Sequence, residues 1–231
     1  MITKQELLDI IASTSFKGLT PDQEIGLPKP FEECNAVSWN LTEFDGKDRL
    51  EPLRSVTGMS TPAYANIINT ICRSMSEDQL YLNIGCYQGF TLLAGMIDTK
   101  CRVIGIDNFS QFGGPKEQCI RNFNKFARDN TQFYDVDYRE YLASHAGKID
   151  FYFYDGHHSY DNQYKAMVDA NKFLEPGCLV LVDDTNVGEV SAATFKAMED
   201  LGRKYDVWVD IKTAHNKHPT YWNGLILLEI L

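Results

Sequence analysis

The sequence lacks any long apolar run and any excess of positive charge. None of its apolar stretches approaches the roughly 20 residues that a membrane-spanning helix needs. The N-terminus carries an acid early, at Glu6, and has no apolar signal-peptide core, so we expect a cytoplasmic protein with no membrane partner. The 231 residues carry a net charge of -10, which argues against nonspecific binding to nucleic acid or to an anionic membrane surface.

The sequence also lacks a CxxC pair. Three of the cysteines lie in or beside apolar, strand-like runs: Cys86, Cys101 and Cys178. Cys34, Cys72 and Cys119 are scattered elsewhere along the chain. This pattern predicts buried, reduced thiols and argues against disulfides or a zinc site.

Strands and helices alternate from Gln79 onward. We expect seven strands, at residues 80–84, 102–106, 131–136, 151–154, 179–182, 205–212 and 221–230. We expect helices at residues 90–97, 115–128, 139–145, 160–174 and 190–204, with Pro176-Gly177 turning the chain into the fifth strand. The alternation predicts an α/β fold, a doubly wound, mostly parallel, seven-stranded sheet that ends in an antiparallel hairpin.

The N-terminal quarter has a different pattern. A short amphipathic helix is expected at residues 4–13, followed by an irregular cap or lid over 15–54 that helps to shape a substrate pocket. Thr61 and Pro62 indicate the start of the next helix, as N-cap and first-turn residue. We therefore divide the chain into a cap segment, residues 1–60, and a main α/β unit, residues 61–231, within a single domain.

Three carboxylates follow two apolar strands of the expected sheet. Asp155 ends one strand, and Asp183 and Asp184 end the next. If these strands are parallel neighbours, their ends lie roughly 5 Å apart, and the acids repel each other unless a hard divalent cation neutralises them. His157 and His158 follow Asp155 closely. The alternative is that these residues only cap the helices that follow.

A glycine loop follows the first strand, in Asn83-Ile84-Gly85-Cys86-Tyr87-Gln88-Gly89. Gly85 and Gly89 are four residues apart, so the loop is not GxGxxG, and a dinucleotide cradle is disfavoured. Asp107 ends the second strand, 107 − 85 = 22 residues past Gly85, where such folds place an acid on ribose hydroxyls. Each feature alone fits an ordinary turn or cap. Together with Asp137 after the third strand, they favour a nucleoside ligand.

These motifs resemble the class I S-adenosylmethionine-dependent methyltransferases over about residues 57–231. The runs Asp155-Gly156-His157-His158-Ser159-Tyr160 and Val182-Asp183-Asp184-Thr185 are similar to the cation-dependent O-methyltransferases, in the branch that includes macrolide-sugar and cephalosporin-pathway enzymes. The resemblance implies a Rossmann-like methyltransferase fold for residues 61–231. One departure is Asn83, where the family commonly has an acid.

The resemblance implies a role for each matching residue toward S-adenosylmethionine. Gly85 and Gly89 would line its methionine part, Asp107 would bind the ribose hydroxyls, and Asp137 with Tyr138 would flank the adenine. Met59 and Ser60 belong to a segment that would close over the cofactor, and Asn83 and Tyr87 complete the set.

The resemblance also implies a Mg²⁺ site at Asp155, Asp183 and Asp184, although adjacent residues tend to point apart and both Asp183 and Asp184 need not be ligands. His158, three residues past Asp155, is the expected general base, because histidine exchanges protons near neutral pH. His157 is the competing choice, or a cap of the following helix.

The predicted function is methyl transfer to a hydroxyl of a small molecule, a sugar or natural product. A homo-oligomer is compatible with it. The alternatives are a metal-independent methyltransferase and a non-catalytic nucleoside-binding or scaffold protein on the same fold.

Overall fold

A computed structural model describes residues 1–25 and 31–231, with only the backbone of residues 31–34. The thiol of Cys34 therefore lies outside the described part. The other five cysteines are buried free thiols, as predicted: Cys72, Cys86, Cys101, Cys119 and Cys178. Within the described ranges, every helix is too short or too polar to cross a bilayer.

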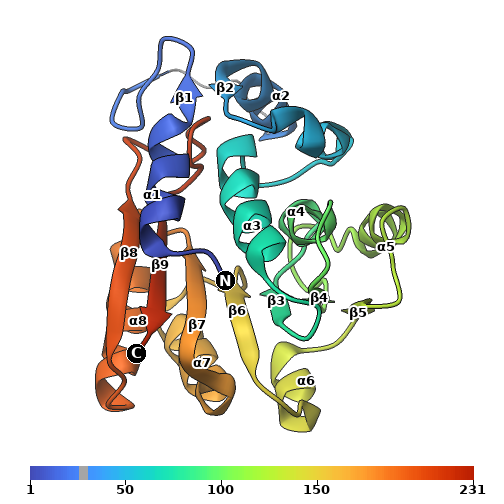
Figure 1. Ribbon diagram of the computed structural model, residues 1–231, viewed down its shortest axis with the longest axis vertical. Coiled ribbons are helices and arrows are strands. Elements are labelled where there is room, and N and C mark those ends of the chain that lie inside the picture. The colour runs from blue at the N-terminus through green and yellow to red at the C-terminus, as the bar shows by residue number, and fades with distance from the viewer. Residues whose placement is uncertain (26–30) are drawn as a thin grey trace.

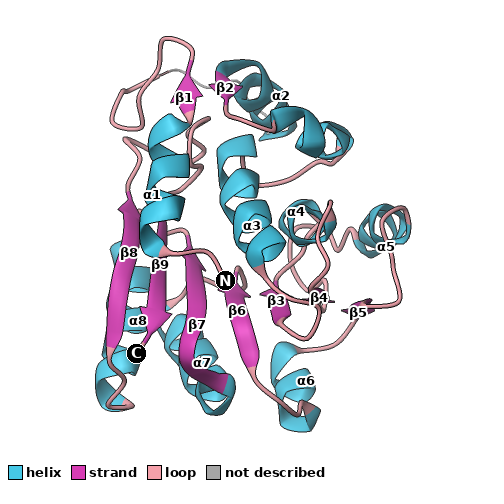
Figure 2. Cartoon of the chain, in the orientation of Figure 1, coloured by secondary structure: helices cyan, strands magenta, loops and turns pink. Residues whose placement is uncertain are grey.

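Figures 1 and 2 show the order of the elements along the chain. The helices are α1 (Lys4–Ser13), α2 (Phe31–Leu41), α3 (Pro62–Ser74), α4 (Phe90–Met96), α5 (Lys116–Asn124), α6 (Tyr138–Ser144), α7 (Tyr160–Ala170) and α8 (Gly188–Asp200), with 3₁₀ turns η1 (Lys47–Ser55) and η2 (Asn171–Phe173). The strands are β1 (Ser15–Phe16), β2 (Thr42–Glu43), β3 (Leu80–Ile84), β4 (Arg102–Ile106), β5 (Thr131–Tyr134), β6 (Ile149–Tyr154), β7 (Leu174–Asp183), β8 (Tyr205–Ile211) and β9 (Leu225–Ile230).

The main sheet has the strand order β5-β4-β3-β6-β7-β9-β8. The first five of these strands pair in parallel, whereas β9 lies antiparallel between β7 and β8. The predicted fold class is confirmed, including the C-terminal hairpin. The predicted neighbourhood of the two acid-bearing strands is also confirmed, because Tyr154 of β6 pairs with Val182 of β7.

Helices cover both faces of the sheet (Figure 1). One apolar core packs α1, α3 and α4 against residues such as Tyr81, Phe151 and Phe153. The other packs α6, α7 and α8 against Tyr152, Val180 and their neighbours. Because successive side chains of a strand point to opposite faces, strands buried on both sides read as continuous apolar runs.

The N-terminal cap is more regular than expected. Where the sequence suggested an irregular segment, the chain forms α2, η1 and a two-stranded sheet of β1 and β2. Helix α1 begins with a capping box, in which Thr3 accepts from the amide of Glu6 and the Glu6 side chain accepts in return. The predicted N-cap Thr61 is confirmed, since its side chain accepts from the amide of Tyr64.

Several expected boundaries were wrong: α5, β5 and α8, for example, end at Asn124, Tyr134 and Asp200, not at residues 128, 136 and 204. Pro176 and Gly177 lie inside β7, where the pairing register with β6 shifts between Ile149 and Phe151, and proline tolerates such an irregularity because no ladder donor is needed there. The last strand begins at Leu225, not at residue 221. The chain from residue 221 to 224 is therefore loop, and it reaches the site described next.

Candidate active site

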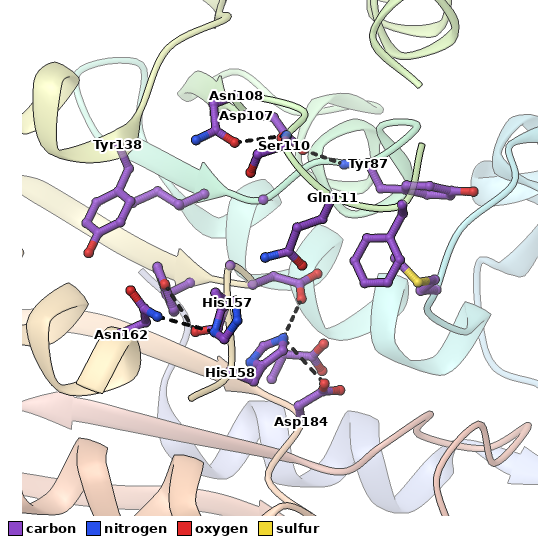
Figure 3. Close-up of a pocket in the computed structure, with 18 of the residues that line it drawn as sticks. Tyr87, Asp107, Asn108, Ser110, Gln111, Tyr138, His157, His158, Asn162 and Asp184 are labelled. Carbon is purple, nitrogen blue, oxygen red and sulfur yellow. Dashed lines mark hydrogen bonds and ion pairs between the residues drawn. The ribbon is translucent and has the colours of Figure 1, made fainter. Parts of the chain in front are cut away.

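A cavity of about 510 Å³ opens at the carboxyl ends of β3, β4, β6 and β7 (Figure 3). This is the edge of an open α/β sheet at which ligands bind, and the volume suits a small molecule or cofactor. The cavity is lined by six predicted cofactor residues, Met59, Gly85, Tyr87, Asp107, Asp137 and Tyr138, and by all the predicted metal and base residues, Asp155, His157, His158, Asp183 and Asp184.

Three predicted cofactor residues do not line this cavity: Asn83, Gly89 and Ser60. Asn83 is fully buried behind the glycine loop, where its side chain donates to the carbonyl of Gly85 at 3.2 Å and accepts from the Thr91 hydroxyl at 3.0 Å. Its amide oxygen, predicted to meet the cofactor, is therefore occupied by Thr91. Gly89 begins α4 with a φ of 99°, and Ser60 is 4% exposed.

Gly85 joins two parts of the site. Its φ of +83° suits glycine, and a Cβ there would lie 1.8 Å from the carbonyl oxygen of Asp155. The amide of Asp155 in turn donates to the carbonyl of Ile84 at 2.8 Å. The end of β3 is therefore packed directly against the end of β6, which brings the glycine loop and the acids to one place.

Asp107 organises the glycine loop from the end of β4. Its Oδ2 accepts from the amides of Cys86 and Tyr87, both at 2.8 Å, and its Oδ1 accepts from the amide of Phe109 at 2.7 Å. A carboxylate has about four acceptor positions, so three are used and one remains for a ligand hydroxyl. Figure 3 shows Asp107 beside Asn108 and Ser110 at the cavity wall.

Asp137 and Tyr138 lie at the start of α6. Asp137 is the N-cap, accepting from the amide of Arg139 at 2.9 Å, and it also lines the cavity. The Tyr138 ring packs edge-on against Tyr154 at 5.6 Å and carries the Arg139 guanidinium at 5.2 Å from its centroid. This gives a flat aromatic wall next to a carboxylate, which can flank an adenine.

Two acids and a histidine form a group that could hold a metal ion. One ligand atom from each of Asp155, His158 and Asp183 lies within 4.8 Å of the others. Burial, and next the charge of Asp184, raises the pKa of Asp155. Burial, and next the charges of Asp155 and Asp184, raises the pKa of Asp183, which is 4% exposed and has one oxygen, Oδ1, buried without a hydrogen-bond partner.

Asp184 lies on the other side of His158. The Nε2 atom of His158 is 3.4 Å from Asp155 Oδ1 and 3.3 Å from Asp184 Oδ2 (Figure 3). The other oxygen of Asp184 accepts from the side-chain amide of Asn223 at 2.5 Å. A left-handed backbone at Asp184, with a φ of 56°, turns the chain so that both adjacent acids reach the cavity. The three acids of the predicted metal site thus line one cavity, and the group whose ligand atoms lie within 4.8 Å of one another contains His158 in place of Asp184.

His157 makes local hydrogen bonds at the start of α7, but the N-cap of that helix is Ser159. The Nδ1 atom of His157 accepts from the amide of Ser159 at 3.2 Å and lies 3.2 Å from the side-chain nitrogen of Asn162. The remaining histidines do not line the cavity. His218, for example, is fully buried and is held by Thr220 and the carbonyl of Gln23.

Two loops contribute further lining residues, of which the sequence did not identify Gln111, Asn216, Lys217 and Asn223, whereas the aromatics Phe109, Phe112 and Trp222 were open as pocket or core residues. Phe109, Gln111 and Phe112 come from the loop after β4, and Asn216, Lys217, Trp222 and Asn223 come from the loop before β9. Six lining residues other than glycine have left-handed backbone, with φ of 50–62°: Tyr87, Phe109, Phe112, Asp184, Lys217 and Trp222. The local signals were Gly113-Gly114-Pro115 in the first loop and Asn223-Gly224 in the second, both typical of turns.

The residues present fit a divalent cation. Two carboxylates with raised pKa values and one orphaned carboxylate oxygen form an acceptor set with no neutralising lysine or arginine among its described contacts. Oxygen ligands suit Mg²⁺ and Mn²⁺, and the imidazole of His158 would admit softer metals as well. The Gly85 loop and the Tyr138 wall likewise fit a nucleoside.

Residues 82–185, less than half of the chain, match the model of a family described as a methyltransferase domain. No curated protein matches the sequence.

Solved structures resemble the fold at low identity. The O-methyltransferase from Bacillus cereus in complex with SAH is 12% identical, with a TM-score of 0.55 over 74% of this chain and 81% of that one. The P. horikoshii protein TYW2 in complex with MeSAdo is 15% identical, with a TM-score of 0.52 over 74% of this chain and 63% of that one. The precorrin 8w decarboxylase from Methanobacterium thermoautotrophicum is 17% identical, with a TM-score of 0.53 over 77% of this chain and 94% of that one.

At such identities the likeness shows the fold alone. The chain shares the fold of these structures, and residues 82–185 match a methyltransferase-domain family. The three proteins carry different names, so the fold does not specify what is methylated.

Proposed function

We propose that this protein is an S-adenosylmethionine-dependent O-methyltransferase that uses a divalent cation, Mg²⁺ first, to act on a hydroxyl of a small molecule such as a sugar or natural product. The observation that carries the proposal is the contact between Gly85 and the carbonyl of Asp155. Through it, a loop suited to the methyl donor and a group of acids suited to a cation share one cavity.

The donor is held by the wall formed from Gly85, Asp107 and Tyr138. Asp107 keeps the loop amides in place and has one acceptor position left for a ribose hydroxyl. Transfer from a sulfonium is an in-line displacement, so this wall must orient the methyl group toward the acceptor oxygen.

The acceptor meets the acids and His158. A bound divalent cation supplies Lewis acidity, which lowers the pKa of a hydroxyl that it coordinates. Asp155 and Asp183 would hold the cation, with Asp184 completing the set, which leaves His158 free to accept a proton. His158 Nε2 lies between two carboxylates, which would stabilise the imidazolium formed when it accepts the hydroxyl proton.

Chelation tests the cation. Methyl transfer should fall to background when divalent ions are removed with EDTA and return when Mg²⁺ is restored. Activity that survives full metal removal contradicts the metal role and favours a metal-independent methyltransferase.

Two variants separate the two ligands. Asp155→Asn should lower turnover by about 100-fold or more, as expected on losing a charge that stabilises the transition state, and should leave S-adenosylhomocysteine binding unchanged. The atoms of Asp155 that would lie nearest to a Cβ at Gly85 belong to its backbone, which the substitution leaves in place, so the loop should be preserved. Asp107→Asn is the matched variant on the donor side. It should weaken S-adenosylhomocysteine binding and leave cation binding unchanged.

Asn83 favours the alternative of a non-catalytic nucleoside-binding protein. It is uncharged, and it is buried behind the loop instead of facing the cavity. Calorimetry decides between the two: a protein that binds neither S-adenosylmethionine nor S-adenosylhomocysteine, with or without Mg²⁺, is not the methyltransferase proposed here.

A further inference from the structure

The loop between β8 and β9 reaches the acids through one side chain. Asn223 uses both ends of its amide: Nδ2 donates to Asp184 Oδ1 at 2.5 Å, and Oδ1 accepts from the amide of Lys217 at 2.6 Å. Its carbonyl also accepts from the amide of Asn186 at 2.8 Å. Asn223 therefore connects three segments that line or border the cavity.

Three residues with strained backbone lie next to the Asn223 side chain. Asp184 and Lys217, the two residues that its amide contacts, have left-handed φ of 56° and 62°, and its neighbour Trp222 has 56°. Side chains rarely adopt this conformation unless the surroundings impose it, and such residues cluster at ligand sites. All three line the cavity.

The rest of the loop is tied firmly to the protein. His218 and Trp222 exchange two backbone hydrogen bonds of 2.9 Å, and the amide of Ala214 donates to the carbonyl of Pro21 at 2.8 Å. The Thr61 hydroxyl donates to the carbonyl of Thr220 at 2.5 Å. The N-terminal cap thus supports this loop, although Met59 is its one described residue that lines the cavity.

An asparagine suits the contact with Asp184. Its NH₂ group stabilises a carboxylate but brings no charge, so the attraction of the acids for a cation is kept. A lysine or arginine there would compete with the cation. The contact also fixes which oxygen is left free, because with Oδ1 engaged, Oδ2 is the atom that faces His158.

We propose that Asn223 is a positioning residue that orients Asp184 toward the cation site and, with the same amide, holds the 213–222 loop at the acceptor side of the cavity. The same side chain then links the placement of the cation to that of the acceptor. The part of this proposal that concerns the cation rests on the proposed function, whereas the part that concerns the loop does not.

The test compares Asn223→Ala with Asn216→Ala. Asn216 lines the same cavity from the same loop and has a hydrogen bond to Asn186 at 3.2 Å, but Asp184 is not among its contacts. Two measurements are made without turnover: Mn²⁺ binding, by electron paramagnetic resonance, and hydrogen exchange of the peptide that spans residues 213–222, in cation-free protein.

Asn223→Ala should weaken Mn²⁺ binding by about 10- to 100-fold, as is usual when a group that orients a metal ligand is removed. It should also speed exchange in the 213–222 peptide at least several-fold. Binding of S-adenosylhomocysteine should stay within two-fold of wild type, because the donor side is untouched. Asn216→Ala should resemble wild type in Mn²⁺ and S-adenosylhomocysteine binding, and because it removes only the contact with Asn186, it should speed exchange less than Asn223→Ala does.

Unchanged Mn²⁺ binding and unchanged exchange in Asn223→Ala overturn the proposal, as does an equal loss in Asn216→Ala. If Asn223→Ala fails to fold, Asn223→Ser replaces it, since a serine hydroxyl is too short to serve both partners. A wild-type protein that binds neither Mn²⁺ nor Mg²⁺ contradicts the proposed function instead, and hydrogen exchange then decides the role of Asn223 in the loop.

Discussion

The two halves of the cavity differ in how far the protein itself hydrogen-bonds their carboxylates. In the donor half, which comprises the Gly85–Gly89 loop, Asp107, Asp137 and Tyr138, Asp107 is engaged by three backbone amides. In the cation half, which comprises Asp155, His158, Asp183, Asp184 and the 213–223 loop, three acids line the cavity and Asp183 has an oxygen without a hydrogen-bond partner.

The difference separates two kinds of preorganisation. The donor half is already satisfied by hydrogen bonds within the protein, so it is shaped to receive a ligand without needing one to neutralise it. In the cation half the repulsion is not relieved, because carboxylates that lie close together destabilise the folded state until something positive binds. Both halves meet at Gly85.

Gly85→Ala should disrupt both halves at once and have the largest effect. The new Cβ would lie 1.8 Å from the Asp155 carbonyl oxygen, so β3 and β6 must move apart in addition to the strain of a positive φ. We expect a loss of about 3 kcal/mol or more in unfolding free energy, and the loss of both S-adenosylhomocysteine and Mn²⁺ binding. Thermal melting and calorimetry measure these.

Gly177→Ala is the matched control. Gly177 has a similar φ of +88° but nothing within 4 Å of the added Cβ, so only the strain remains, about 1 kcal/mol. If the two variants lose equal stability, the close approach of the two strands does not matter.

Replacing each of the two adjacent histidines should change turnover by very different factors. His158→Ala should lower turnover by about 10²- to 10⁴-fold if His158 is the general base. His157→Ala removes only a helix-start contact and should change turnover less than about three-fold, with a loss of about 1 kcal/mol in stability. Steady-state kinetics at saturating cation make the comparison, and a larger effect at His157 would reverse the assignment.

The pH dependence of stability should reveal the repulsion among the acids of the cation half. Asp155 and Asp183 have raised pKa values in the folded protein, so folding favours their protonated forms. Their contribution is present below the ordinary carboxyl pKa of about 4 and is lost as the pH rises through the raised values. In EDTA, the melting temperature of wild type should therefore fall relative to Asp183→Asn as the pH rises toward neutral.

Mg²⁺ should reverse this trend. A cation at 100 times its dissociation constant adds about 2.7 kcal/mol, equivalent to roughly 5–10 °C in a protein of this size. Asp183→Asn should gain much less from Mg²⁺. If the melting temperatures of wild type and Asp183→Asn change in parallel at every pH, with and without Mg²⁺, the acids do not repel each other as described.

The sequence predicted the parts of the site that strands position. Asp107, Asp155 and Asp183 follow apolar strands, and parallel strands bring their carboxyl ends to one edge, so their meeting follows from topology. The residues Leu80–Ile84 and Arg102–Ile106 form the expected strands without any shift.

The parts positioned by loops were not predictable in the same way. Asn83 directly follows an apolar strand residue, yet its amide oxygen accepts a hydrogen bond from Thr91 on the next helix. The sequence pattern does not predict this contact. Trp222 and Asn223 were assigned to the last strand because the run 221–230 is rich in apolar residues. A left-handed backbone at Trp222 ends that pattern early, and bulky residues seldom signal such a turn.

The six left-handed residues around the cavity have a consequence for engineering. Replacing any of them with glycine would relieve strain of about 1 kcal/mol, so a screen for thermostability would select such exchanges. Phe112, which is 65% exposed, would be among the easiest to accept. Every such gain would remove a side chain from the cavity wall, so a library selected for heat resistance alone would drift toward a stable protein with an emptier, less selective pocket.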